Sequence, residues 1–185
     1  MVWRFTVFFL LLAWGSVSHA HTVEIELSGE YARANYVSGP LGGKAGRLEY
    51  DAGLIYNENN DYLLNGSLMV RAENLDVPLL IAAGGRLYLG EVTDKDVGAL
   101  ALGGDLIYAP AVLAGFEFGG RLFFAPKVTS FADAEQVLDY SIWAGYQISS
   151  LATIYIGYQS LETKLKQLGD QKVADSAFLG LSFHF

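Results

Sequence analysis

The residues best suited to chemistry in this chain are a serine and a histidine close to its end. Ser182 precedes His184 by two residues, and residues two apart on a strand point to the same face. That spacing would place a hydroxyl beside an imidazole, the pairing on which serine-dependent hydrolysis relies. The sequence offers no third group to orient the histidine, so we predict no catalytic residues and no enzymatic activity. A lipid-modifying membrane enzyme acting through Ser182 is the alternative.

Metal, cofactor and nucleic-acid sites are not predicted either. The chain has no cysteine, and its three histidines are His19, His21 and His184, whereas a metal site needs clustered ligands. Glycine pairs such as Gly84-Gly85 recur before a charged residue and leucine, but they lack the spacing and the following helix of a phosphate-binding loop. A formal net charge of −8 disfavours nucleic acid, because phosphate binding needs a basic surface.

The N-terminal segment, residues 1–20, has the layout of a secretory signal peptide. Arg4 gives a positive start, residues 5–14 form an apolar run, and Ser18 and Ala20 occupy the −3 and −1 positions of a cleavage site. The apolar run is too short to cross about 30 Å of hydrocarbon. We therefore expect export, removal of residues 1–20 and a mature chain that begins at His21.

The rest of the chain alternates between apolar and polar residues with a period of two, which is typical of strands. Most segments are longer than the ~5–6 residues of soluble strands and suit tilted strands that cross a bilayer. Short connections join neighbouring segments, so the pattern predicts an all-β, antiparallel, up-and-down transmembrane barrel. The expected strands are residues 22–35, 47–57, 61–73, 79–90, 97–109, 115–125, 136–148, 151–162 and 175–185.

Each expected strand has one apolar face and one charged face. In a chain that is 52% hydrophobic, the apolar faces could point to lipid, or inward in a soluble periplasmic barrel that binds an apolar ligand. We favour lipid, with Arg71, Arg86 and Arg121 paired with carboxylates in a filled interior, and with Glu49 and Asp51 as packing groups. The charged face comprises Arg47, Glu49, Asp51, Arg71, Glu73, Arg86, Asp105, Glu117, Arg121, Asp139 and Gln147.

The end of the chain carries the most specific signal. Apolar side chains stand at every second position from Ala177 to Phe185, so the chain stops on an aromatic residue. This segment resembles the closing strand that the assembly machinery of the outer membrane recognises. An apolar edge strand is also an aggregation hazard unless it is paired. We therefore expect residues 175–185 to close the barrel and to bind that machinery.

The number of strands is less clear from the sequence, because such barrels contain an even number and the segments number nine. We favour a barrel of eight strands over residues 47–185, with residues 21–46 as an extra strand or plug. The alternative splits residues 22–35 into a short hairpin near Ser28-Gly29 and gives ten strands.

Several short motifs occur along the expected strands and their connections. They are Gly84–Tyr88, Phe123–Pro126, Ser130–Ala134, Gly145–Gln147, Ile154–Tyr158 and the aromatic end. In these motifs, residues 108–185 resemble the C-terminal half of the YfaZ family of bacterial outer-membrane proteins, and the match covers most of the mature chain, more loosely before Arg47. The resemblance implies an outer-membrane barrel and no known activity, so it assigns no functional residues. We expect a structural or porin-like monomer in contact with outer-membrane lipids.

Overall fold

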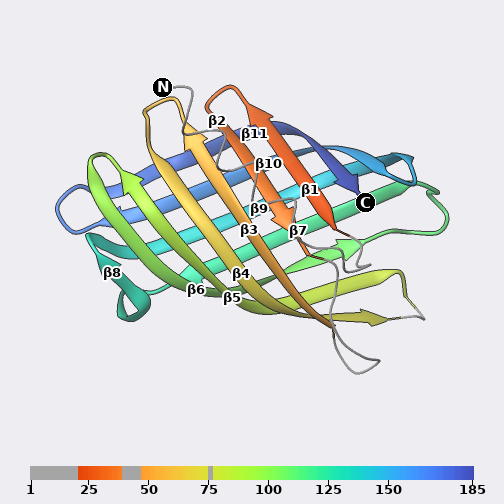
Figure 1. Cartoon of the computed structure of the whole chain (residues 1–185), viewed down its shortest axis with the longest axis horizontal. Coiled ribbons are helices and arrows are strands. Elements are labelled where there is room, and N and C mark those ends of the chain that lie inside the picture. Colours follow the sequence, from red (N-terminus) through yellow and green to blue (C-terminus); the bar gives the residue numbers. More distant parts are fainter. Residues whose placement is uncertain (1–20, 39–46, 75–76) are drawn as a thin grey trace.

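The computed structural model describes residues 21–38, 47–74 and 77–185 (Figure 1). The predicted signal peptide, residues 1–20, lies outside the described residues, as do residues 39–46 of the predicted N-terminal segment. Within the described ranges, no helix has the length and apolar character needed to cross a membrane.

The described residues form one antiparallel sheet of eleven strands, with a single turn of 3-10 helix, η2 (Lys127–Thr129). Most strands exceed ten residues, as the long alternating segments predicted. The strands are β1 (Thr22–Ser28), β2 (Tyr31–Val37), β3 (Arg47–Asn57), β4 (Tyr62–Asn74), β5 (Leu79–Val92), β6 (Lys95–Tyr108), β7 (Phe116–Ala125), β8 (Ser130–Ala132), β9 (Ala134–Ser149), β10 (Ala152–Leu165) and β11 (Gly169–His184).

The sheet closes into an up-and-down barrel of ten strands, with the short β8 lying beside β6. Closure joins the first and last strands, β1 and β11, in an antiparallel ladder. The backbone amides of His21 and Phe185 donate to each other's carbonyls at 2.7 and 2.9 Å. We call the end of the barrel that holds both residues the terminal end. The opposite end, toward the left of Figure 1, is the distal end.

The prediction of eight strands is wrong, and the ten-strand alternative is confirmed. Residues 22–37 form the hairpin β1–β2 instead of one strand or a plug. The hydroxyl of Ser28 accepts hydrogen bonds from the amides of Glu30 at 3.0 Å and Tyr31 at 2.9 Å, a local bond that favours a turn over a continued strand. The hairpin fills the wall between β11 and β3, so the apolar edge of β11 is paired.

The distal end is built from tight turns. The β5–β6 hairpin turns through Thr93 and Asp94, whose φ values are +52° and +57°. Two consecutive left-handed residues match the right-handed twist of the flanking strands. Asp61 supports this turn from the neighbouring hairpin, because its Oδ1 accepts a hydrogen bond from the amide of Thr93 at 2.7 Å. The distal rim is therefore held together across hairpins.

The two faces of the sheet point as the sequence predicts. Leu102, Ile142 and Ile156 project outward and are 70%, 63% and 63% exposed, whereas Arg86 and Asp139 project inward and are 1% and 0% exposed. Outward apolar side chains of this kind occur on every long strand of the barrel. The charged face fills the interior.

Inward glycines make room for large inward side chains. A Cβ atom at Gly119 would lie 2.1 Å from the indole of Trp143, and one at Gly180 would lie 2.2 Å from the ring of Tyr155. Each glycine is the direct ladder partner of the aromatic residue, Gly119 of Trp143 and Gly180 of Tyr155. The narrow barrel thus accommodates aromatic rings inside because a glycine faces each ring.

Candidate functional site

Arg86 on β5 is the centre of a buried ion-pair network inside the barrel. Its Nη2 lies 2.9 Å from Oδ2 of Asp51, and its Nη1 lies 3.7 Å from Oδ2 of Asp139. The guanidinium carbon stands 4.1 Å from the ring centroid of Phe123, within cation–π distance. The hydroxyl of Ser67 donates to the same Asp51 carboxylate. A single arginine therefore connects β3, β4, β7 and β9.

Asp139 extends this network to the opposite wall. Its two carboxylate oxygens accept hydrogen bonds, both at 2.6 Å, from the hydroxyl of Tyr88 and from Nε2 of Gln159. The amide oxygen of Gln159 in turn accepts a hydrogen bond from Nη1 of Arg33 at 2.9 Å. Arg33 lies 3.9 Å from the carboxylate of Glu26. The chain of contacts thus reaches β10, β2 and β1, and it crosses the interior from wall to wall.

Two further ion pairs lie nearer the terminal end. Nε of Arg121 lies 3.1 Å from Asp105, and Nη2 of Arg71 lies 2.8 Å from Glu49. The side chain of Arg71 is 23% exposed and that of Arg121 is 10% exposed, against 1% for Arg86. Access to water thus increases from the middle of the barrel toward the terminal end.

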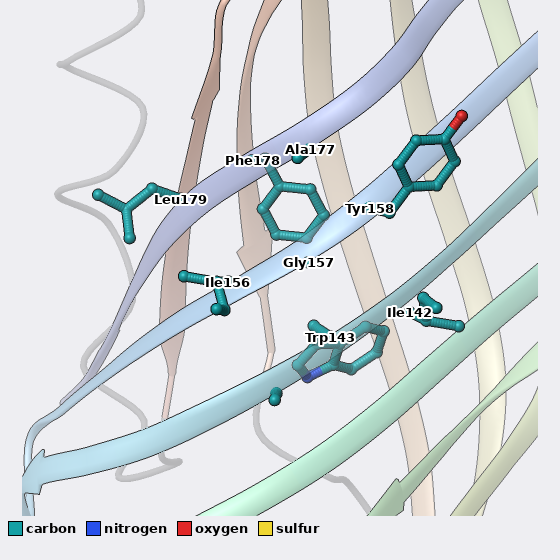
Figure 2. Close-up of a pocket in the computed structure, with 9 residues that line it drawn as sticks. Ile142, Trp143, Ile156, Gly157, Tyr158, Ala177, Phe178 and Leu179 are labelled. Atoms are coloured by element: carbon teal, nitrogen blue, oxygen red, sulfur yellow. The ribbon is translucent and has the colours of Figure 1, made fainter.

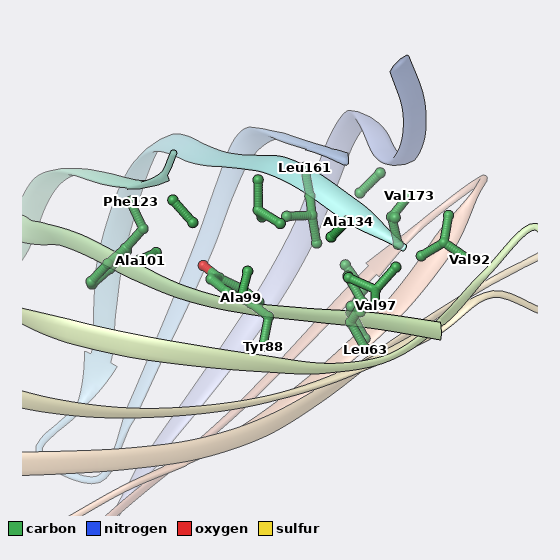
Figure 3. Packing of buried hydrophobic residues seen from close by; sticks show 14 of the residues in the cluster. Leu63, Tyr88, Val92, Val97, Ala99, Ala101, Phe123, Ala134, Leu161 and Val173 are labelled. Carbon is green, nitrogen blue, oxygen red and sulfur yellow. The ribbon is translucent and has the colours of Figure 1, made fainter. Parts of the chain in front are cut away.

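The distal end of the interior is sealed by apolar side chains. Residues from both sides of the barrel meet there, and Figure 3 shows Leu161 and Val173 gathered with Leu63, Val92 and Val97. All five are between 0% and 3% exposed. Apolar contacts exclude water from this end, so the charged network lies between a closed distal end and a more hydrated terminal end.

The network is suited to filling and fixing the interior. Burial of charges is costly, and it is tolerated where each charge is paired and hydrogen bonded. Arg71, Arg86 and Arg121 all form the ion pairs with carboxylates that the sequence predicts. Glu49 pairs with Arg71 and Asp51 pairs with Arg86, as expected of packing groups.

Sequence reasoning did not identify Glu26, Arg33 and Gln159 as members of the network. Read as one strand, residues 22–35 put Glu26 and Arg33 on opposite faces, because their numbers differ by an odd value. Because the chain turns between β1 and β2, the two residues lie on one face and are direct partners in the ladder. The inward position of Gln159 could have been predicted, since it directly follows Tyr158, and both Tyr158 and Ile156 face outward.

The serine and histidine considered for hydrolysis lie at the terminal end. Nδ1 of His184 lies 3.0 Å from Oγ1 of Thr22 on β1, so the imidazole is engaged by a different hydroxyl. Ser182 is buried, with 6% of its surface exposed. Among the residues that the structure describes, no hydrogen bond joins Ser182 to His184, and no group of three or more histidine, cysteine, aspartate or glutamate residues could hold a metal ion.

A shallow apolar hollow lies on the outer wall over β9, β10 and β11. Figure 2 shows Phe178 and Trp143 on the two sides of Gly157 at its centre. These two rings belong to the inward face, and a Cβ atom at Gly157 would meet Phe178 at 2.6 Å. On the outward face the hollow is bordered by Ile142, Ala144, Ile156, Tyr158, Ala177 and Leu179.

Comparison with known proteins gives one family. A family model described as YfaZ precursor matches residues 6–185, nearly the whole chain. Comparison with curated proteins and with solved structures finds no match.

Proposed function

The chain belongs to the YfaZ family, and we propose that it is an integral, monomeric β-barrel of the bacterial outer membrane with a structural role and a closed interior. The observation that carries the proposal is the sorting of side chains. Leu102, Ile142 and Ile156 are among many large apolar residues that face outward on a closed barrel, and the arginines and carboxylates face inward. In water this arrangement would expose a large apolar area at high cost, whereas lipid is its natural solvent.

The dimensions of the apolar belt support a membrane location. On β7, outward side chains run from Phe116 to Phe124, both more than 40% exposed. Eight steps of ~3.4 Å make about 27 Å along the strand, which a tilt of about 40° reduces to roughly 20 Å, near the ~25 Å apolar band of such barrels. Aromatic residues stand at both ends of this belt, as in interfacial girdles.

We also propose that the chain reaches the outer membrane by export and by recognition of its C-terminal strand. The family is described as a precursor, which agrees with export through the predicted signal peptide. The C-terminal strand presents Leu179, Phe183 and Phe185 outward, with exposures of 53%, 42% and 63%. A strand of this pattern suits recognition by the outer-membrane assembly machinery before the barrel closes.

The filled interior favours a structural role over a porin. Arg86, Asp139 and Gln159 are at most 1% exposed, and they meet in the middle of the barrel. A barrel of similar strand number is filled by its own side chains, whereas open channels need more strands. A soluble barrel for an apolar ligand would need an apolar interior, and this one is charged at its centre.

The proposal is tested by fractionation followed by conductance. We expect the mature chain to sediment with outer membranes, to resist extraction by urea and to require detergent. Refolded into planar bilayers, it should give no regular conductance steps. A chain that stays soluble without detergent would contradict the membrane location, and regular steps would contradict the closed interior. Lipid turnover that Ser182→Ala abolishes would favour the enzyme alternative.

A further inference from the structure

The hollow on the outer wall has short outward side chains at its centre and longer ones at its border. Ala144 and Ala177 carry the short side chains, whereas Ile142, Ile156 and Leu179 stand around them and are 63%, 63% and 53% exposed. The result is a shallow apolar hollow that is open to the surroundings of the barrel.

A row of charged groups lies on β10 and β11, on the distal side of this hollow. The hydroxyl of Tyr158 donates to Asp175, and the ammonium of Lys172 donates to the other oxygen of Asp175. Lys172 also lies 3.7 Å from Glu162. Lys164 follows on the outward face of β10 and is exposed. This row, Glu162, Lys164, Lys172 and Asp175, contains two cations and two anions.

Cationic side chains are concentrated near this row. Five lysines occur in the described part of the chain, and three of them lie on β10, on β11 or on the connection between these strands, namely Lys164, Lys166 and Lys172. Of the other two, Lys95 begins β6 and Lys127 begins η2. The described arginines are inside the barrel, apart from Arg47 at the start of β3.

The strands that carry the row rise above the neighbouring wall. The ladder between β1 and β11 ends at Ser28 and Phe178, so the part of β11 from Gly169 to Ala177 lies beyond the end of β1. Between Tyr158 and Glu162 there are four steps of ~3.4 Å, about 14 Å along the strand. At the tilt of about 40° usual for membrane barrels, the backbone of Glu162 and of its ladder partner Lys172 stands about 10 Å above that of the tyrosine.

We propose that this wall binds a zwitterionic glycerophospholipid, with an acyl chain in the hollow and the headgroup on the charged row. Its phosphate meets Lys172 and Lys164, and its ammonium meets Glu162 and Asp175. A row with two cations and two anions matches a headgroup that carries both charges. An anionic headgroup would offer no positive charge to the two carboxylates. This inference rests on the proposed membrane location, because only a chain surrounded by lipid presents the hollow to acyl chains.

Native mass spectrometry of the refolded mature chain tests the proposal, with phosphatidylethanolamine and phosphatidylglycerol as probes. We expect one phosphatidylethanolamine to be retained, with affinity about fivefold above that of phosphatidylglycerol. Ala177→Leu fills the hollow and Lys172→Gln removes a cation, so each should remove this preference. Ala83→Leu on the outward face of β5 and Lys95→Gln are the matched controls and should preserve it. Lys172→Arg should preserve it as well.

The outcomes of this experiment separate the lipid site from the membrane location. Equal retention of both lipids, a preference for phosphatidylglycerol, or equal effects of the test and control variants would overturn the lipid site. Every variant is first checked for a folded, heat-modifiable band in electrophoresis, and Ala177→Leu keeps the test decisive if Lys172→Gln does not fold. Failure of the wild-type chain to enter any bilayer would refute the membrane location itself. Insertion without lipid preference would refute only the site.

Discussion

At the scale of single residues, the interior of the barrel depends on charges that are held away from water. Arg86 serves two carboxylates, those of Asp51 and Asp139, from a position that is 1% exposed. Such a group adds little net stability compared with an apolar residue of the same shape, but its loss leaves buried charges without a partner. Removal of the arginine alone therefore tests the network better than replacement of the whole network by apolar residues.

Substitution of this arginine should be strongly destabilising. We expect Arg86→Ala to lower the free energy of unfolding by about 3–5 kcal/mol, because Asp51 and Asp139 then lose their counter-charge. Equilibrium unfolding of the refolded chain in urea, followed by tryptophan fluorescence, measures the change. Lys95→Ala, in the distal hairpin, is the control and should change stability by less than about 0.5 kcal/mol. A similar small effect for both variants would show that the network is not essential.

The inward glycine at position 119 leaves room for the indole of Trp143. Gly119→Ala would place a methyl group 2.1 Å from the indole of Trp143, so we expect a loss of about 1–3 kcal/mol from overpacking. The next residue, Gly120, faces outward, and a methyl group there would meet its nearest neighbour at 3.7 Å. Gly120→Ala should therefore be close to neutral in the same unfolding experiment. Equal effects at the two sites would contradict the inward placement of Trp143.

At the scale of elements, the hairpin β1–β2 decides whether the sheet closes. It pairs with β11 on one side and with β3 on the other. Without it, two long strand edges would be left unpaired, and unpaired backbone groups are not tolerated in lipid. The hairpin is thus part of the barrel wall although its strands are the shortest of the ten.

Deletion of residues 22–37 separates the eight-strand and ten-strand architectures. The ten-strand barrel predicts that the deleted chain loses the compact, heat-modifiable form that folded barrels show in electrophoresis. As a control, shortening the distal connection between β10 and β11 by Gln167 alone should preserve that form. A deleted chain that still folds and resists protease would contradict the closure seen between β1 and β11.

Most of the wall could be predicted from the sequence, because period-two alternation and turn residues are local signals. The segments that became β3 to β7, β9 and β10 were predicted within about three residues, whereas β11 begins at Gly169, six residues before the predicted segment 175–185. The N-terminal hairpin was not favoured, since polar and apolar residues continue to alternate through the turn at Ser28 to Tyr31. The short β8 was missed as well, because three residues carry no periodicity and its pairing with β6 depends on the tertiary structure.

At the scale of the whole molecule, two sortings define the protein. Apolar and charged side chains are separated between the outside and the inside. The described lysines lie at the distal surface, and the described arginines other than Arg47 lie in the interior. The first could be read from strand parity. The partners inside the barrel could not, because the contact of Arg86 with Asp139 joins strands that are distant in sequence and depends on the diameter of the closed barrel. The sequence indicated charged residues in the interior but not their pairing.

The outward orientation of the apolar face is tested most directly by fluorescence quenching with dibrominated phosphatidylcholine. Trp143 is the only one of the three tryptophans outside residues 1–20, and it points into the barrel. In vesicles of brominated lipid, the wild-type emission should remain largely unquenched. Leu102→Trp in a Trp143→Phe background places the indole at a site that is 70% exposed, and its emission should be strongly quenched. Stronger quenching of Trp143 than of the indole at position 102 would contradict the account.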